Sequence, residues 1–165
     1  MSFTDFTDRF PKLDLPLELG EESYRAFEAG GRPLLSDELV AEYVAPLEPQ
    51  PIDDYTEVLP VGKWVARGYV AVVYWKAGLL HNHYRLATFD RHGNPVENRV
   101  IAGSYVDGDE VSHSAATITR ERVVYVVSGQ AALGDELGRA GANTAVRLGV
   151  DDGGVIEELG GGGAS

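Results

Sequence analysis

Short apolar runs separated by turn residues dominate the chain downstream of Glu57. Residues 83–89 and 95–102 are two β-rich runs that flank the sequence DRHGN, in which Gly93 would supply a positive φ after a type I turn. Residues 69–76 show little polar alternation, which predicts a strand covered on both faces. The remaining strand-like runs are residues 58–66, 116–119, 123–128, 144–150 and 155–159. Together these runs predict about eight strands.

The predicted strands follow one another without an α-helix long enough for a crossover connection. This excludes a parallel α/β sheet and predicts a mainly β fold, an antiparallel meander that forms either a barrel or a sandwich. Residues 129–143 are rich in Gly and Ala and predict a loop, and the Gly-rich tail at residues 160–165 is expected to be disordered.

The clearest helix of the N-terminal third is predicted at residues 37–45. Ser36 is a suitable N-cap, and Asp37 and Glu38 complement the positive end of the helix dipole. Pro46 is expected to end this helix.

The rest of residues 1–56 is irregular, with a second short helix indicated by the composition of residues 21–29. A chain of 165 residues has the length of one domain. We therefore expect a single domain over residues 1–159, in which residues 1–56 form an acidic, partly helical segment that packs on the antiparallel sheet of residues 57–159.

Charge is distributed unevenly along the chain. Residues 1–57 hold fourteen carboxylates against four basic residues, a net charge of −10, and residues 58–165 hold twelve against ten, a net charge of −2. A negative field repels phosphate backbones and anionic lipids, so neither nucleic acid nor a membrane is an expected partner. The same field favours encounter with a basic protein surface.

Composition also limits the chemistry. The chain has no cysteine, which excludes disulfides, thiolate metal ligands and cysteine nucleophiles. The N-terminus lacks the pattern of a secretory signal, and the apolar runs are far shorter than the ~20 residues needed to cross a bilayer. A cytoplasmic location is the prediction.

Three of the four histidines lie close together in the sequence. His81 and His83 are separated by one residue, so on a strand both imidazoles would face one side and could share a metal ion. Asp90, His92 or His113 would supply a third ligand across hairpins, and Tyr84 would line the same site. This arrangement supports an alternative hypothesis, a small-ligand- or metal-binding β-barrel protein, with or without enzymatic activity, that uses His81 and His83.

No motif specifies a catalytic residue or a cofactor, and none is expected. Ser112, His113 and Ser114 lack the Gly-x-Ser-x-Gly context of a hydrolase nucleophile, and Gly62-Lys63 lacks the glycine spacing of a phosphate-binding loop. The acidic turns resemble calcium loops only superficially, because turn geometry itself favours Asp and Gly.

The preferred hypothesis is therefore a non-enzymatic protein-binding module, such as an immunity-type inhibitor or an accessory subunit of a bacterial complex, that recognises a basic partner surface. A homo-oligomer formed by pairing of edge strands is a further alternative, with residues 13–19 (LDLPLEL) as the expected edge. The candidate partner-binding residues are Asp37, Glu38, Glu42, Asp53, Asp54 and Tyr55.

Several short patterns resemble those of a loose group of small uncharacterised bacterial β-rich proteins. The matching patterns are Pro60-Val61-Gly62-Lys63, then Tyr84-x-Leu86-x-Thr88-Phe89-Asp90-x-x-Gly93, then Ile101-Ala102-Gly103 and a terminal D-x-G-x-I hairpin. The resemblance spans residues 10–159. It implies a strand-rich fold without an assigned activity, and it transfers no catalytic residue.

Overall fold

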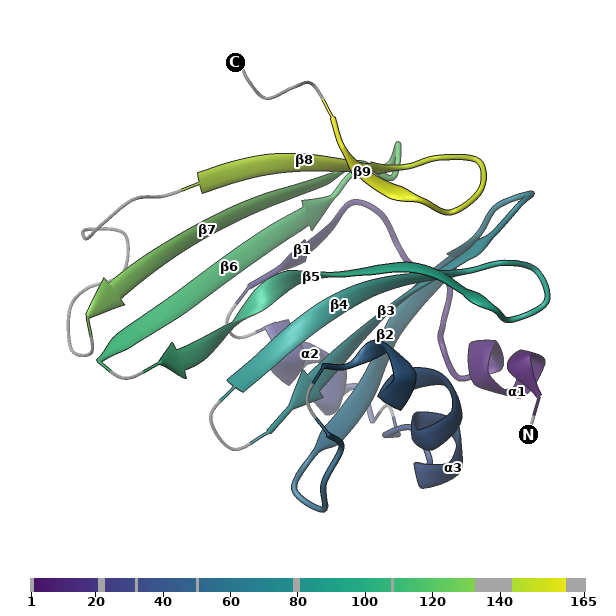
Figure 1. The fold of residues 1–165 in the computed structure, drawn as a ribbon, viewed down its shortest axis with the longest axis horizontal. Helices are drawn as coiled ribbons and strands as arrows, with labels where there is room; N and C mark the ends of the chain where they lie inside the picture. Colours follow the sequence, from purple (N-terminus) through teal and green to yellow (C-terminus); the bar gives the residue numbers. More distant parts are fainter. Residues whose placement is uncertain are drawn as a thin grey trace.

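The structure of the protein is a computed structural model. It describes residues 2–20, 23–31, 33–49, 51–78, 81–107, 109–132 and 144–159. The predicted tail at residues 160–165 and most of the predicted loop at residues 129–143 lie outside these ranges. Figure 1 shows one long, strongly curved sheet with short helices gathered at one end of it.

Eight strands follow one another as an antiparallel meander, each paired with the next (Figure 1). They are β2 (Glu57–Val65), β3 (Val70–Ala77), β4 (His81–Phe89), β5 (Pro95–Asp107), β6 (Glu110–Ile118), β7 (Val124–Ala132), β8 (Thr144–Val150) and β9 (Ile156–Glu158). Within the described part of the chain β2 and β9 do not pair with each other, so the sheet is open. The predicted mainly β antiparallel meander is confirmed.

The sheet bends sharply at β5. Residues 95–105 of β5 pair with β4, but only residues 103–107 pair with β6. Gly103 lies at this divergence with φ +133°, and a Cβ there would clash with backbone atoms of Asn82 and His83. Only glycine adopts such a backbone without strain, so Gly103 permits the bend.

The part of β6 that β5 leaves unpaired is taken by a ninth strand, β1 (Leu17–Leu19). Leu17 pairs with Ile118 and Leu19 with Ala116, and Leu19 is buried in the core. The segment predicted as an edge for self-association is thus already paired within the chain.

Both faces of β3 are buried, as its apolar sequence predicts. Ala71 and Val73 point into one apolar cluster, whereas Val72 and Tyr74 point into another. The alternation follows from the two-residue period of a strand. Each face of this end of the sheet is therefore covered. The N-terminal segment covers one face, and β6–β9 together with part of the N-terminal segment cover the other.

One face is covered by the elements α1 (Phe3–Asp8), α3 (Asp37–Leu39), the π-helical turn η1 (Val40–Val44) and the 3₁₀ turn η2 (Ala45–Leu47). Phe6, Leu39 and Val44 are fully buried against β3 and β4 on this face. Ser36 caps α3 as predicted, with its hydroxyl accepting the Leu39 N–H at 3.4 Å. The helical turns continue to Leu47, so Pro46 does not end them and is accommodated within the 3₁₀ turn.

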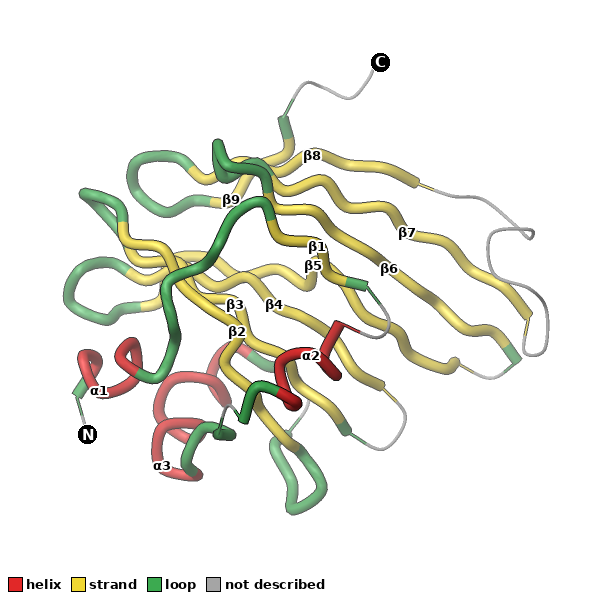
Figure 2. Tube along the Cα trace, turned by 180° about the vertical axis from the view of Figure 1, so that it is seen from behind, coloured by secondary structure: helices red, strands yellow, loops and turns green. Residues whose placement is uncertain are grey.

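The opposite face packs against buried residues of β6–β9, among them Ile118 and Leu148. The helix α2 (Ser23–Ala29) also packs on this face and lies in front of the sheet in Figure 2. Tyr24 stacks on Trp75 with ring centroids 4.7 Å apart and planes 2° apart, and Phe27 packs edge-on against Tyr84. The strands β3 and β4 thus lie between α1 with α3 on one side and α2 with β6–β9 on the other.

Candidate functional site

A buried cluster of charged side chains lies where the N-terminal segment meets β3 and β4. Glu48 directly follows η2, and its side chain is wholly buried. Its Oε2 atom accepts a hydrogen bond from the Tyr74 hydroxyl. The same atom accepts a second hydrogen bond from Arg85 Nε, at 2.7 Å. Its Oε1 atom lies 3.3 Å from Lys76 Nζ and 3.2 Å from His83 Nε2.

The four partners of Glu48 are positioned by strand pairing. Tyr74 and Lys76 alternate on β3 and face the same side, as do His83 and Arg85 on β4. The register places Tyr74 opposite Arg85 and Lys76 opposite His83. Two adjacent strands therefore present a two-by-two array of donors, and Glu48 lies over it.

The cluster holds more positive than negative charge. Lys76 and Arg85 are both buried and share the single carboxylate of Glu48. Burial alone would raise the pKa of Glu48, but hydrogen bonds from His83 and Tyr74 and the charges of His83 and Arg85 outweigh it and hold that pKa well below its usual range. Burial, and then the neighbouring Glu48 carboxylate, raise the pKa of Tyr74, so its phenol stays protonated.

A half-open pocket of about 560 Å³ adjoins this cluster. One end is polar, and the wall formed by β5 is mostly small or apolar. The polar end includes Glu48, His81, His83 and Arg85, and the wall includes Val100, Ala102, Gly103 and Val106, with Ser112 and Ser114 contributed by β6. The bend at Gly103 therefore shapes the pocket wall.

Two polar groups at this end have hydrogen-bonding capacity that the described protein atoms do not use. Arg85 donates from Nε and Nη2 to Glu48 and from Nη1 to Asn98 at 2.5 Å, which occupies three of the five N–H groups of a guanidinium. His81 Nε2 is buried without a hydrogen-bond partner. Burial and the charges of Lys76 and His83 lower the pKa of His81, which favours its neutral form.

The residues of the predicted histidine site are brought together only in part. His81 and His83 stack with ring centroids 5.8 Å apart. Asp90 and His92 lie in the turn beyond the other end of β4, about 30 Å from His81 at the rise of an extended strand. There Asp90 accepts the backbone N–H of His92 at 2.8 Å, so its carboxylate stabilises the turn. Tyr84 lies on the opposite face of β4, in the core under α2.

No group of three or more potential metal ligands is found among the residues that the structure describes. The two imidazoles are the nearest approach to such a site, and the carboxylate close to them, Glu48, is already engaged by Lys76 and Arg85.

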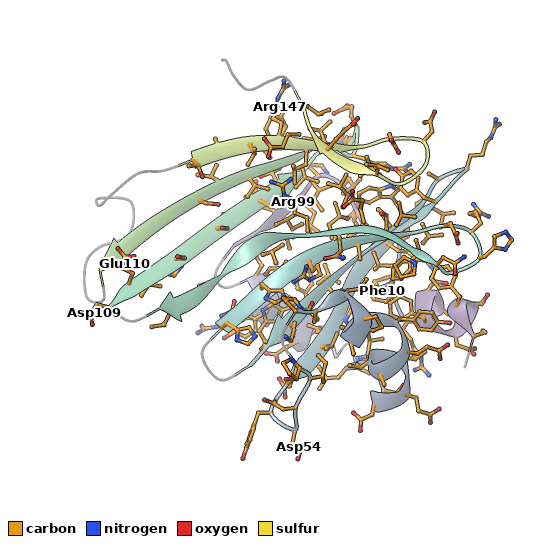
Figure 3. The ribbon with its side chains drawn as sticks, viewed as in Figure 1. Phe10, Asp54, Arg99, Asp109, Glu110 and Arg147 are labelled. Atoms are coloured by element: carbon orange, nitrogen blue, oxygen red, sulfur yellow. The ribbon has the colours of Figure 1, made fainter. Side chains whose placement is uncertain are left out.

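The residues predicted to bind a protein partner all lie on the surface. These are Asp37, Glu38, Glu42, Asp53, Asp54 and Tyr55. Asp54 lies at the tip of the loop before β2 (Figure 3), and the adjacent Tyr55 is 69% exposed. Asp53 has a local structural task, because its carboxylate accepts the Tyr55 N–H at 2.9 Å and the Thr56 hydroxyl at 3.0 Å.

Four members of the cluster were not predicted as site residues from the sequence: Glu48, Tyr74, Lys76 and Arg85. The signal available was the presence of Lys76 at the end of the apolar run VAVVYW and of Arg85 between Tyr84 and Leu86. A charged residue inside a strand expected to be buried is rarely unpaired, so it indicates an ionic partner elsewhere in the chain.

Fold and site together describe a mainly β protein with an open, curved sheet and a pocket whose polar end is a buried ionic cluster. Comparisons of the chain with protein-family models, with curated proteins and with solved structures found no match. None of the described helices has the length and apolar character required to cross a bilayer.

Proposed function

We propose that this protein binds a small organic molecule in the pocket beside Glu48. The observation that carries the proposal is the combination of a preformed pocket with a charged donor at its polar end, Arg85, whose contacts with Glu48 and Asn98 use three of its five N–H groups. The pocket volume of about 560 Å³ lies within the range of small-molecule sites, roughly 300–1,000 Å³.

The buried cluster supports this proposal energetically. Burying Lys76, Arg85 and Glu48 carries a desolvation cost that apolar residues of similar volume would not carry, so the cluster is poorly explained by stability alone. Held rigidly by Glu48, the guanidinium of Arg85 is oriented before any ligand arrives. Such preorganisation lowers the entropic cost of binding.

The proposal is tested with a neutral fluorescent probe, N-phenyl-1-naphthylamine, titrated into the wild-type protein. We expect saturable binding that is weakened by about tenfold or more in Val106→Trp, which places an indole in the pocket. Val127→Trp is the matched control, because Val127 is 53% exposed on β7 and does not line the pocket. Absence of saturable binding, or equal weakening in both variants, would contradict the proposal.

A second candidate function is that of a protein-binding module that recognises a basic surface. It is favoured by Tyr55, an aromatic side chain that is 69% exposed beside Asp53 and Asp54. Exposed aromatic residues are frequent anchors of interfaces, and the surrounding charge would speed association with a basic partner. An immunity-type inhibitor or an accessory subunit would work in this way.

This second function is tested by affinity capture from the source cells with wild type and with a Tyr55→Ala, Asp54→Lys variant. We expect one stoichiometric partner that the variant does not capture. Raising the salt concentration should release this partner from wild type, because salt screens attraction between surface charges. Recovery of the protein alone, or a partner that the variant retains, would refute it.

A further inference from the structure

We propose that the ligand carries a carboxylate, which Arg85 binds, and an apolar body that lies along Val100 and Val106. This inference rests on the function proposed above for the same pocket. It assigns the ligand to the class of small organic acids, on the basis of local charge, free donors and the character of the pocket wall.

The charge of the cluster is the first support. Lys76 and Arg85 share one buried carboxylate, Glu48, so the buried groups carry an excess of one positive charge. The other carboxylate near Lys76 is Asp53, which is exposed on the loop before β2 and therefore screened by water. His81 responds to this positive environment, since the charges of Lys76 and His83 add to burial in lowering its pKa. An anionic ligand would balance the excess, whereas a cationic ligand would increase it.

The donors are the second support. Glu48 engages Arg85 through Nε and Nη2, and Asn98 engages Nη1 at 2.5 Å. These contacts use three of the five N–H groups, and the charged guanidinium can donate a remaining one to a carboxylate, the acceptor with which it forms its strongest hydrogen bonds.

The wall is the third support, and it separates an organic acid from an inorganic anion. Val100 and Val106 of β5 remain 42% and 39% exposed although they line the pocket. A ligand that covered them would remove apolar surface from water, which a phosphate or sulfate ion could not do. The ligand therefore needs both an acidic head and an apolar body.

The test compares two probes of closely similar shape, the anionic 2-naphthoate and the neutral 2-naphthamide, by isothermal titration calorimetry. A charge-assisted hydrogen bond is about twice as strong as a neutral one, so we expect wild type to bind the carboxylate about tenfold more tightly than the amide. In Arg85→Gln this preference should fall to about threefold or less. Arg99→Gln is the matched control, because Arg99 (Figure 3) pairs with Glu158 at the surface and does not line the pocket.

Each outcome has a distinct meaning. Equal affinity of wild type for the two probes, or a preference that Arg85→Gln retains, overturns the inference while leaving the proposed function intact. Failure of both probes and of N-phenyl-1-naphthylamine overturns the proposed function itself. If Arg85→Gln does not fold, Glu48→Gln/Lys76→Gln/Arg85→Gln removes the three buried charges together and provides the same comparison. Acetate or phosphate that binds as tightly as naphthoate would contradict the role assigned to the apolar wall.

Discussion

Replacement of Glu48 by glutamine should destabilise the protein strongly although the change is nearly isosteric. Glutamine leaves Lys76 and Arg85 buried without a counter-charge. Removing one partner of a buried ion pair costs about 3–5 kcal/mol, a large share of the 5–15 kcal/mol by which typical domains are stable. For a chain of this size the melting temperature should fall by about 6–20 °C.

The assay is urea unfolding at pH 7 followed by circular dichroism. If the free energy of unfolding falls with urea at the same slope in wild type and variant, the shift of the midpoint reports the change in stability. Glu158→Gln is the matched control. Glu158 pairs with Arg99 at 3.1 Å, but 58% of its side chain is exposed, so its loss should cost less than about 1 kcal/mol. A Glu48→Gln protein as stable as the control would refute the assignment of Glu48 as the counter-charge of the buried cations.

The pH dependence gives a second readout of the same residue. The pKa of Glu48 is lowered in the folded protein, so its ionisation stabilises the fold above its unfolded pKa of 4.5, and that stabilisation is lost as the pH falls further toward the folded pKa. Because glutamine resembles the protonated acid, the difference in stability between wild type and Glu48→Gln should shrink as the pH falls below 4.5. A difference that grows on acidification would contradict the reasoning.

Three further predictions follow from other parts of the structure. Gly103→Ala should destabilise the fold by about 2 kcal/mol or more, because φ is +133° and the new methyl group would meet backbone atoms of β4. Gly153→Ala is the control in the same urea assay and should have little effect, because Gly153 lies on an exposed turn. Phe6→Ala should cost about 3–5 kcal/mol in thermal unfolding, because the ring is fully buried under the sheet. One equivalent of zinc should leave the melting temperatures of wild type and of His81→Ala/His83→Ala unchanged. Zinc sites need three or four protein ligands, and His81 and His83 provide two. A rise in melting temperature confined to wild type would instead support a metal site.

Local sequence signals predicted the elements whose structure depends on neighbouring residues. Ser36 caps its helix because a hydroxyl there can accept a backbone N–H three residues later, and Gly93 adopts φ +92° because the turn requires it. A further local signal was missed. Ser2 and Asp5 form a capping box that starts α1, in a segment that was expected to be irregular.

The cluster could not be predicted in this way, because its members are distant in the sequence. Glu48 and Arg85 are 37 residues apart and meet only after the N-terminal segment docks on the sheet. Glu48 lies in the proline-rich connector, where a carboxylate is normally solvated, and no periodicity marks it as buried. Strand alternation could have separated Tyr84 from His83, since consecutive residues of a strand face opposite sides.

The site also reconciles an acidic protein with an anionic ligand. The net charge is −12, and most of the described carboxylates are exposed, where counterions screen them beyond about 8–10 Å. Lys76 and Arg85 are buried, so water and salt weaken their field much less within the pocket than they weaken the field of the surface carboxylates. The surface would slow the approach of an organic acid, but the affinity is set by the groups that the ligand touches. Because Glu48 comes from the N-terminal segment and the cations come from β3 and β4, the docked N-terminal segment is part of the binding site as well as part of the core.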